Sequence, residues 1–301
     1  PFTAQLIKAI SADYEQGGRI AALLANWTTN PRADALALRF AGYFHHAVLT
    51  NRDPALAAHY PSNVANWSID DIWPLARALL DREPNAAAQF IRSAPQTNET
   101  RRSIALLAAF LHFAETWKGE IDMLEIGASA GLNTNWDLYT YKTKSWAWGA
   151  EGPVQIDTDW NGPPPPIADI NVRNRAACDL NPLDISDETQ RLQLKSYIWP
   201  DQPQRLARFD GAAALARETG VRVERADAAE WLSHKLAQRA DDAATVVYHS
   251  VFLQYPPREV RDAIISVVHA AGADATERAP FAWVRLEPEA VTGDAPDSPR
   301  M

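Results

Sequence analysis

A short segment of small residues, with glycine at positions 127 and 131 and Ser129 between them, could bind a ligand through its backbone. Glycine leaves the main chain open to close approach and adopts the left-handed conformations that tight turns require. The segment follows an apolar run that ends near the acid Glu125. A glycine-containing turn between a strand and a helix is typical of nucleotide-binding sites.

Two further acids follow the next apolar runs. Asp179 ends one of them, and Asp227 follows another and precedes the small residue Ala228. A carboxylate at the end of the second strand can accept hydrogen bonds from both ribose hydroxyls, and a polar group after the third strand can meet the base. Together with the glycine segment, these acids predict a nucleoside site. The alternative is that each acid caps the next turn or helix.

A fourth apolar run ends with His249 and Ser250 and is followed by Tyr255. His249 could act as a base, because histidine titrates near neutral pH, while Ser250 or Tyr255 could orient a substrate. The alternative is a buried histidine with hydrogen bonds inside the protein. The chain has neither a His-x-x-x-His nor a Cys-x-x-Cys spacing, so no metal site is expected.

Residues 127–131 also match the Gly-x-Ser-x-Gly pattern of serine hydrolases, which would make Ser129 a nucleophile. That fold places several strands before its nucleophile. Here about 120 residues with helical patterns come first. A hydrolase therefore remains the less favoured alternative.

The elements that must position these residues alternate between short apolar runs and amphipathic helices after Gly119, as in a parallel sheet covered by helices. The predicted strands are 121–126, 175–179, 221–225, 245–249 and 281–287. The predicted helices are 186–198, with Ser186 as a cap, 204–219, 228–239 and 257–271. This pattern predicts a doubly wound, Rossmann-like α/β domain over residues 120–301, in which residues 141–171 form an inserted hairpin or structured loop rich in Trp and Pro.

Residues 1–119 show helical periodicity interrupted by prolines, which predicts a helical N-terminal cap domain. Its last helix would begin at Thr97 or Asn98 and stop at Gly119 in a left-handed conformation. Asn98 and Arg102 would then share a helix face. Arg102 could pair with a substrate carboxylate or with Glu125, or could simply form a salt bridge between the domains.

Composition excludes several classes of protein. The 301 residues carry a formal charge of −9 with a pI of about 5.3, which argues against binding to nucleic acid or to an anionic membrane. A single cysteine, Cys178, cannot form an internal disulfide, so a cytoplasmic protein is expected. No apolar stretch is long enough to span a membrane.

Several segments resemble the bacterial family known as domain of unknown function 2332. They are 96–103, 124–133, Trp136-Asp137 with Tyr139 and Tyr141, 179–184, 199–202 and 248–251. The resemblance implies a helical region followed by a domain like class I S-adenosylmethionine-dependent methyltransferases, and further residues beyond position 301. It implies no substrate.

Three features differ from an ordinary methyltransferase. Ser129 replaces the central glycine of the cofactor turn, and its hydroxyl could donate to a carboxylate. Asp179 lies 48 residues after Gly131 (179 minus 131), whereas a compact unit needs about 20. His249-Ser250 stands in place of the Asn-Pro-Pro-Tyr type of motif, so methylation of nucleic-acid bases is not expected.

We therefore expect methyl transfer from S-adenosylmethionine to a small molecule, with His249 or Asp137 accepting a proton. The alternative is a protein that binds the nucleoside as a sensor without catalysis. The expected cofactor contacts are Glu125, Gly127, Ala128, Ser129, Gly131, Asn133, Asp179, Asp227 and Ala228. The expected substrate contacts are Asn98, Arg102, Tyr139, Ser250 and Tyr255.

Overall fold

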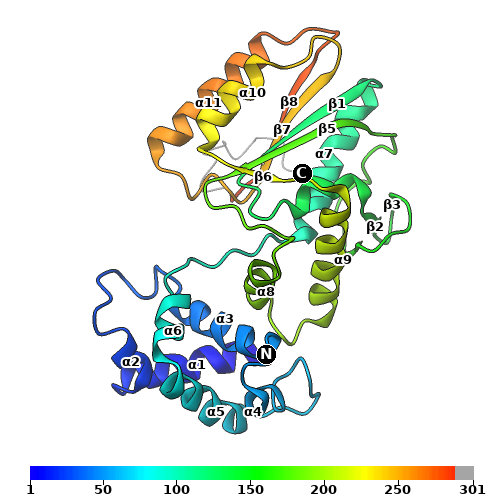
Figure 1. Ribbon diagram of the computed structural model, residues 1–301. Coiled ribbons are helices and arrows are strands. Elements are labelled where there is room, and N and C mark those ends of the chain that lie inside the picture. The colour runs from blue at the N-terminus through cyan, green and yellow to red at the C-terminus, as the bar shows by residue number, and fades with distance from the viewer. Residues whose placement is uncertain (289–301) are drawn as a thin grey trace. The chain divides into compact units, whose positions relative to one another are not determined.

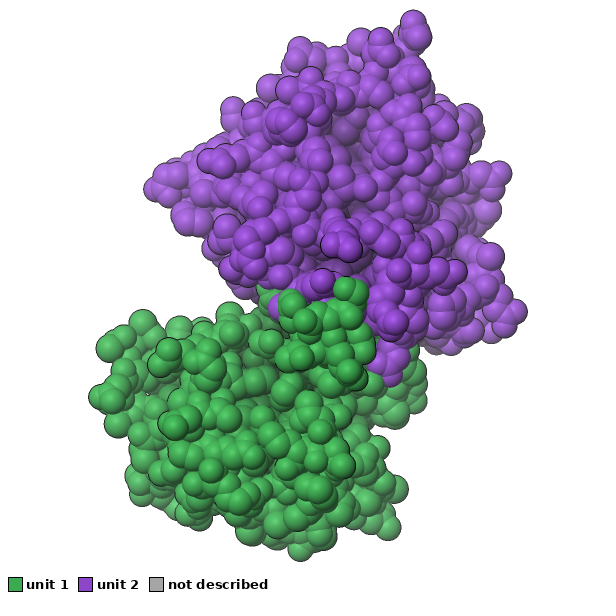
Figure 2. All heavy atoms as spheres, viewed as in Figure 1, with its two compact units in different colours: residues 1–97, 186–209 green, residues 98–185, 210–301 purple. Residues whose placement is uncertain are grey.

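A computed structural model describes residues 1–288 and divides the chain into two compact units (Figure 2). Unit 1 contains Pro1–Thr97 and Ser186–Phe209. Unit 2 contains Asn98–Ile185 and the described residues from position 210 onward. Residues 289–301, the end of the predicted second domain, lie outside the described residues.

Unit 1 is built from helices (Figure 1). They are α1 (Phe2–Glu15), α2 (Arg19–Leu23), α3 (Leu36–Leu49), α4 (Pro54–Ala57), α5 (Ile69–Arg82), α6 (Pro84–Phe90) and α8 (Glu188–Ser196). Helix α9 (Pro203–Thr219) begins in unit 1 and ends in unit 2. Local residues explain several of these starts: the Asp53 carboxylate accepts from the Leu56 amide at 2.9 Å, and the Ser68 hydroxyl accepts from the Asp70 amide at 3.2 Å.

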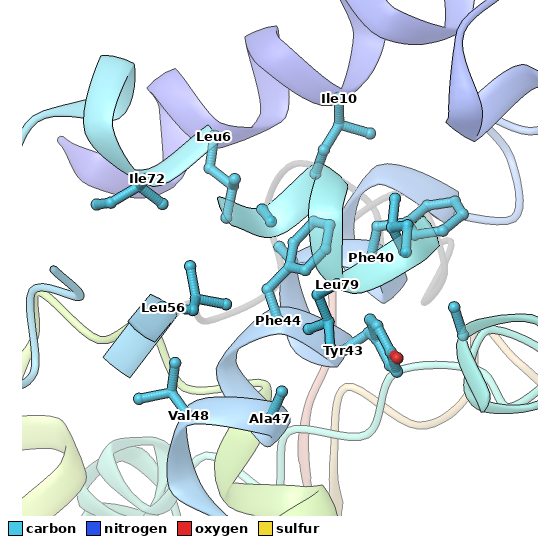
Figure 3. Packing of buried hydrophobic residues seen from close by; sticks show 14 of the residues in the cluster. Leu6, Ile10, Phe40, Tyr43, Phe44, Ala47, Val48, Leu56, Ile72 and Leu79 are labelled. Atoms are coloured by element: carbon cyan, nitrogen blue, oxygen red, sulfur yellow. The ribbon is translucent and has the colours of Figure 1, made fainter. Parts of the chain in front are cut away.

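The core of unit 1 is formed by apolar side chains of α1, α3, α4 and α5, which converge in Figure 3. Helix α8 packs against α3 although 138 residues, 50–187, lie between the two helices in the sequence. At Gly42 an added Cβ would lie 2.6 Å from the ring of Tyr197, so glycine allows this close approach. His45 Nδ1 also lies 3.1 Å from the carbonyl oxygen of Ser196. Unit 1 is therefore built from two segments distant in sequence.

Unit 2 contains a five-stranded parallel sheet with the order β6-β5-β1-β7-β8 (Figure 1). The strands are β1 (Glu120–Ile126), β5 (Asn171–Asp179), β6 (Val223–Arg225), β7 (Ala244–Ser250) and β8 (Phe281–Leu286). All five predicted strands are present. The chain adds strands on one side of β1 and then on the other, so the strand order reverses between β1 and β7.

The two faces of the sheet carry different helices. Leu124, Ile126 and Val247 pack against α10 (Ala228–Ala237) and α11 (Arg258–Ala273). The alternate residues Glu125 and Tyr248 lie on the other face, toward α7 (Ser103–Thr116) and the 3-10 segment η2 (Leu132–Leu138). This alternation follows from the two-residue period of a strand. The structure is thus a mixed α/β fold with helices on both faces of a parallel sheet.

The predicted insertion forms a small three-stranded sheet of order β3-β2-β4. Its strands are β2 (Thr140–Lys142), β3 (Ala147–Trp148) and β4 (Gln155–Asp157). Aromatic side chains hold it near η2: the Tyr141 hydroxyl donates to the carbonyl oxygen of Trp136 at 2.8 Å, and the rings of Trp136 and Trp148 are 6.3 Å apart. The insertion is therefore a packed part of unit 2.

Some predicted boundaries are wrong. Asn98 lies outside the helix with φ 29°, and the Glu99 carboxylate caps the 3-10 turn η1 (Thr100–Arg102), so Asn98 and Arg102 do not share a helix face. Gly119 is not left-handed, because α7 already ends at Thr116 with an extended residue after it. The cap of α8 is Asp187, whose carboxylate accepts from the Gln190 amide, and not Ser186.

The predicted domain boundary also differs from the units of the structure. It falls at 119/120, whereas the units separate after Thr97 because α7 packs against β8 and η2. No helix of the described chain is long and apolar enough to cross a membrane.

Candidate functional site

The glycine turn, residues 127–131, connects β1 to η2 at the point where the strand order reverses. Gly127, Ser129 and Gly131 have left-handed φ values of 66°, 58° and 72°. A left-handed conformation is natural for glycine but uncommon for serine. The predicted turn is therefore present, and its conformation explains two of its residue types.

Three of the five amides of this turn, those of Ala128, Ser129 and Gly131, already have partners within the chain. The Ala128 amide donates to the Cys178 carbonyl at 3.1 Å, and the Gly131 amide donates to the Ala128 carbonyl at 2.8 Å. The Leu132 amide donates to Asn98 Oδ1 at 3.0 Å. Loops that cradle phosphate groups present free amides to the ligand. The glycine turn is consequently better suited to close backbone contact than to binding a phosphate.

Asp179 connects the end of β5 to the glycine turn. Its Oδ2 accepts from the Ser129 amide at 2.9 Å, and its Oδ1 accepts from the Asn181 amide at 2.8 Å. An ionised carboxylate has about four acceptor positions, so each oxygen can accept one further hydrogen bond. Asp179 therefore stabilises the turn and keeps the capacity to accept hydroxyl groups.

Asp227 is the N-cap of α10. Its Oδ1 accepts from the amides of Ala229 and Glu230 at 2.9 and 3.2 Å. Ala228, the first residue of the helix, is buried. This geometry matches the capping alternative, and cofactor contact by Asp227 and Ala228 stays a prediction.

Glu125 lies in β1, two residues before the turn, and is 4% exposed. Its Oε2 accepts from the Thr134 hydroxyl at 2.7 Å and from the Tyr248 hydroxyl at 3.3 Å. Burial raises the pKa of Glu125 to about 7, against the opposing effect of these two hydrogen bonds. Glu125 is thus a buried acid that titrates near neutral pH.

The segment η2 and the residue that follows it bring further predicted residues to the same face of the sheet. Asn133 is buried, and its side-chain amide donates weakly to the Glu99 carbonyl at 3.4 Å. Tyr139 is buried and donates to the Leu132 carbonyl. Asp137 forms an ion pair with Arg175 of β5 through Oδ2.

The second oxygen of Asp137, Oδ1, has no hydrogen-bond partner among the described residues. Burial raises the pKa of Asp137 against the opposing effect of Arg175. Asp137 therefore combines a fixed position with one free acceptor atom, which is what a proton acceptor needs.

His249 is fully buried and lies on the opposite face of the sheet from Tyr248. Its Nδ1 is 2.6 Å from Glu287 Oε1, and its Nε2 accepts from Trp283 Nε1 at 3.1 Å. Burial lowers the pKa of His249. Both ring nitrogens are therefore occupied within the chain, as in the alternative of a buried, hydrogen-bonded histidine.

The remaining predicted substrate contacts lie in different environments. Arg102 donates to the Ser250 carbonyl at 3.4 Å, while Glu125 accepts from hydroxyl groups. Of the alternatives predicted for Arg102, the pair with Glu125 is therefore not formed, and contact with a substrate carboxylate stays a prediction. Tyr255 is 75% exposed.

Ser129 does not have the environment of a hydrolase nucleophile. Its hydroxyl is buried, and in the part of the chain that the structure describes no side chain hydrogen-bonds to it. Its backbone amide, not its hydroxyl, donates to the Asp179 carboxylate. A serine nucleophile is activated by a base within hydrogen-bond reach.

A surface hollow of about 430 Å³ lies elsewhere, beside the small sheet. Lys144 and Asp159, which line it, form a 2.8 Å ion pair with side chains 89% and 72% exposed. The Arg101 guanidinium donates to the Thr158 hydroxyl at its rim. Because these groups are solvated and already paired, we place the candidate site at the glycine turn.

Five residues around the turn are not among the site residues predicted from the sequence: Thr134, Arg175, Tyr248, Phe252 and Glu287. Tyr248 precedes the predicted His249 by one position, so strand alternation could have placed it on the face of Glu125. Glu287 ends the fifth predicted strand, and an acid at that position was a detectable signal. The others are recognisable only from three-dimensional contacts.

The family model described as "Uncharacterized protein conserved in bacteria (DUF2332)" matches residues 1–301, so the chain belongs to this family. No curated protein and no solved structure matches the chain.

Proposed function

We propose that this protein binds S-adenosylmethionine at the glycine turn and transfers its methyl group to a small molecule. The observation that carries the proposal is the left-handed glycine turn at the reversal of strand order, tied to β5 by Asp179. Open α/β sheets bind ligands beyond the carboxyl ends of the strands at this point. In order of appearance the strands run 3-2-1-4-5, as in Rossmann-like folds.

The partnered amides of the turn favour this cofactor over other nucleotides. NAD and ATP carry phosphates, which glycine-rich turns bind with free amides. S-adenosylmethionine has no phosphate, and its ribose hydroxyls match the remaining acceptor positions of Asp179. The acceptor positions of Asp179 therefore fit a nucleoside without phosphates.

When bound, S-adenosylmethionine supplies an electrophilic methyl group. The protein's contribution is to hold the methyl acceptor in line and away from water. We assign proton acceptance to Asp137 Oδ1, since both ring nitrogens of His249 have partners. Arg175 would stay beside the Asp137 carboxyl group whether that group is ionised or protonated.

Calorimetry with the purified protein tests the proposal. We expect S-adenosylmethionine and S-adenosylhomocysteine to bind at micromolar concentrations, and NAD and ATP not to bind. Asp179→Ala should weaken binding at least tenfold. Asp242→Ala is the matched control, because this acid pairs with Arg173 on the surface of the same unit and precedes β7.

Equal binding by the Asp179→Ala variant and the parent would refute the ribose assignment, and absence of binding would refute the cofactor. Release of S-adenosylhomocysteine in the presence of candidate acceptors then separates a transferase from a sensor, because a sensor binds the cofactor without turnover.

A further inference from the structure

The turn that follows β7 has an unusual backbone conformation. Val251 has φ 53°, a left-handed value that a β-branched residue rarely adopts. Such conformations persist only where the surroundings enforce them, and they concentrate at ligand clamps and switches. We call residues 251–253 the covering turn.

A buried carboxylate holds the covering turn in place. Glu287 Oε1 accepts from the Phe252 amide at 2.7 Å and from the Leu253 amide at 3.2 Å. The same oxygen lies 2.6 Å from His249 Nδ1, and the Val251 amide donates to the Leu286 carbonyl at 2.7 Å. Burial opposes ionisation of Glu287, but the bonds from His249 and Phe252 outweigh it and lower its pKa.

The result of this arrangement is that the Phe252 ring lies on Gly127. A Cβ added to Gly127 would be 2.2 Å from Phe252 Cδ2 and 2.7 Å from Cγ. The open backbone face of the first glycine, which a ligand of the glycine turn would approach, is therefore occupied by an aromatic side chain of the same chain.

We infer that Phe252 covers the glycine turn, that a ligand of this turn displaces it, and that Glu287 is the positioning residue that keeps the cover closed. The inference deepens the proposed function and rests on it for the identity of the ligand. It also gives the buried His249 and the partly buried Trp283 a role, because they complete the hydrogen-bond chain that orients Glu287.

The cover can be tested without a ligand by hydrogen exchange of the full chain. Glu287→Gln keeps the shape of the side chain and removes the charge that the two amides contact. We expect the amides of Phe252 and Leu253 to exchange at least tenfold faster in this variant, together with those of the glycine turn. Amides in the middle of β1 should not change, and Glu277→Gln, an exposed substitution, should have no effect.

Calorimetry with S-adenosylhomocysteine tests the displacement. A closed cover lowers apparent affinity by the fraction of open molecules, so Phe252→Ala should bind at least fivefold more tightly than the parent. Phe113→Ala, a half-buried phenylalanine of α7, is the control.

Unchanged exchange in Glu287→Gln, or equal or weaker binding by Phe252→Ala, would overturn the inference. If neither the parent nor any variant binds S-adenosylhomocysteine, the proposed cofactor is wrong, and the exchange result alone decides whether Phe252 covers the turn.

Discussion

At the scale of single residues, the buried acid Glu125 makes a clear prediction of pH dependence. Its pKa is raised to about 7 by burial, from 4.5 in the unfolded chain. Between these values the native state retains a proton that the unfolded state loses, so its contribution to stability is full below pH 4.5 and is lost as pH rises to about 7. The size of this effect is about 3 kcal/mol.

Glu125→Gln should remove this dependence, because a side-chain amide does not titrate, while its oxygen can still accept from Thr134 and Tyr248. We expect the free energy of unfolding of the variant, relative to the parent, to rise between pH 4.5 and 7 and to stay constant above. Urea unfolding at several pH values measures this difference. Glu115→Gln, on the exposed side of α7, is the control, and a parallel pH profile of Glu125→Gln and the parent would contradict the burial effect.

A second prediction concerns Gly127. Alanine at this position would meet two obstacles, the left-handed φ and the Phe252 ring. We expect Gly127→Ala to cost about 3 kcal/mol or more in the parent and about 1–2 kcal/mol in a Phe252→Ala background, where only the backbone cost remains.

Gly220 separates these two costs. It has nearly the same φ, 67°, with no atom within 4 Å of an added Cβ, so Gly220→Ala should cost only the backbone part, about 1 kcal/mol. Thermal unfolding of Gly127→Ala, Phe252→Ala, the double variant and Gly220→Ala, each compared with the parent, gives the double-mutant cycle and the backbone cost. Additive effects of Gly127→Ala and Phe252→Ala would show that the ring does not cover the glycine.

At the scale of elements, the ion pair between Asp137 and Arg175 joins η2 to β5. The two side chains are only 9% and 20% exposed. Removing one partner leaves a buried charge alone, so Arg175→Met should cost about 3 kcal/mol, and adding Asp137→Asn should restore much of it. Lys144→Met, which breaks an exposed pair with Asp159, should leave the free energy of unfolding nearly unchanged in the same assay, because solvent screens this pair. Equal losses would contradict the importance of burial.

Elements with strong periodicity could be predicted from sequence, and those that depend on contacts could not. Runs such as 121–126 and 245–249 place apolar residues on both faces, which is typical of buried parallel strands, and all five were found. The ends of helices were less accessible: Asp187 and Ser186 are equally good caps in sequence, and geometry selects Asp187.

The candidate site shows the same division. The glycine turn follows from residue types, since left-handed φ values favour glycine. The partners of His249 could not be predicted, because both lie more than 30 positions away: Trp283 is in β8, and Glu287 follows that strand. A histidine at a strand end looks the same in sequence whether its nitrogens are free or occupied.

At the scale of the whole molecule, the last prediction follows from the fact that unit 1 is built from two segments distant in the sequence. Residues 1–97 alone would lack the Ser196 carbonyl that contacts His45 and the Asp201 carboxylate that accepts from the Phe2 amide at 3.0 Å. The face of α3 at Gly42, covered by Tyr197, would be open to water. We expect the fragment 1–97 to unfold at a lower temperature than unit 1 in the full chain.

Adding a peptide of residues 186–209 should raise the unfolding temperature of this fragment, and more so at higher peptide concentration, since a ligand that binds only the folded state stabilises it by mass action. The same peptide with Tyr197→Ala should raise it much less. The fragment 1–119, cut at the boundary predicted from sequence, should gain no stability over 1–97, because the apolar residues Leu107, Phe110 and Leu111 of α7 pack within unit 2. Circular dichroism on heating measures all three. Stable, cooperative unfolding of 1–119 without the peptide would show that residues 186–209 are dispensable for the stability of the helical unit. The contacts between the two segments of unit 1 would then contribute little to its free energy of unfolding.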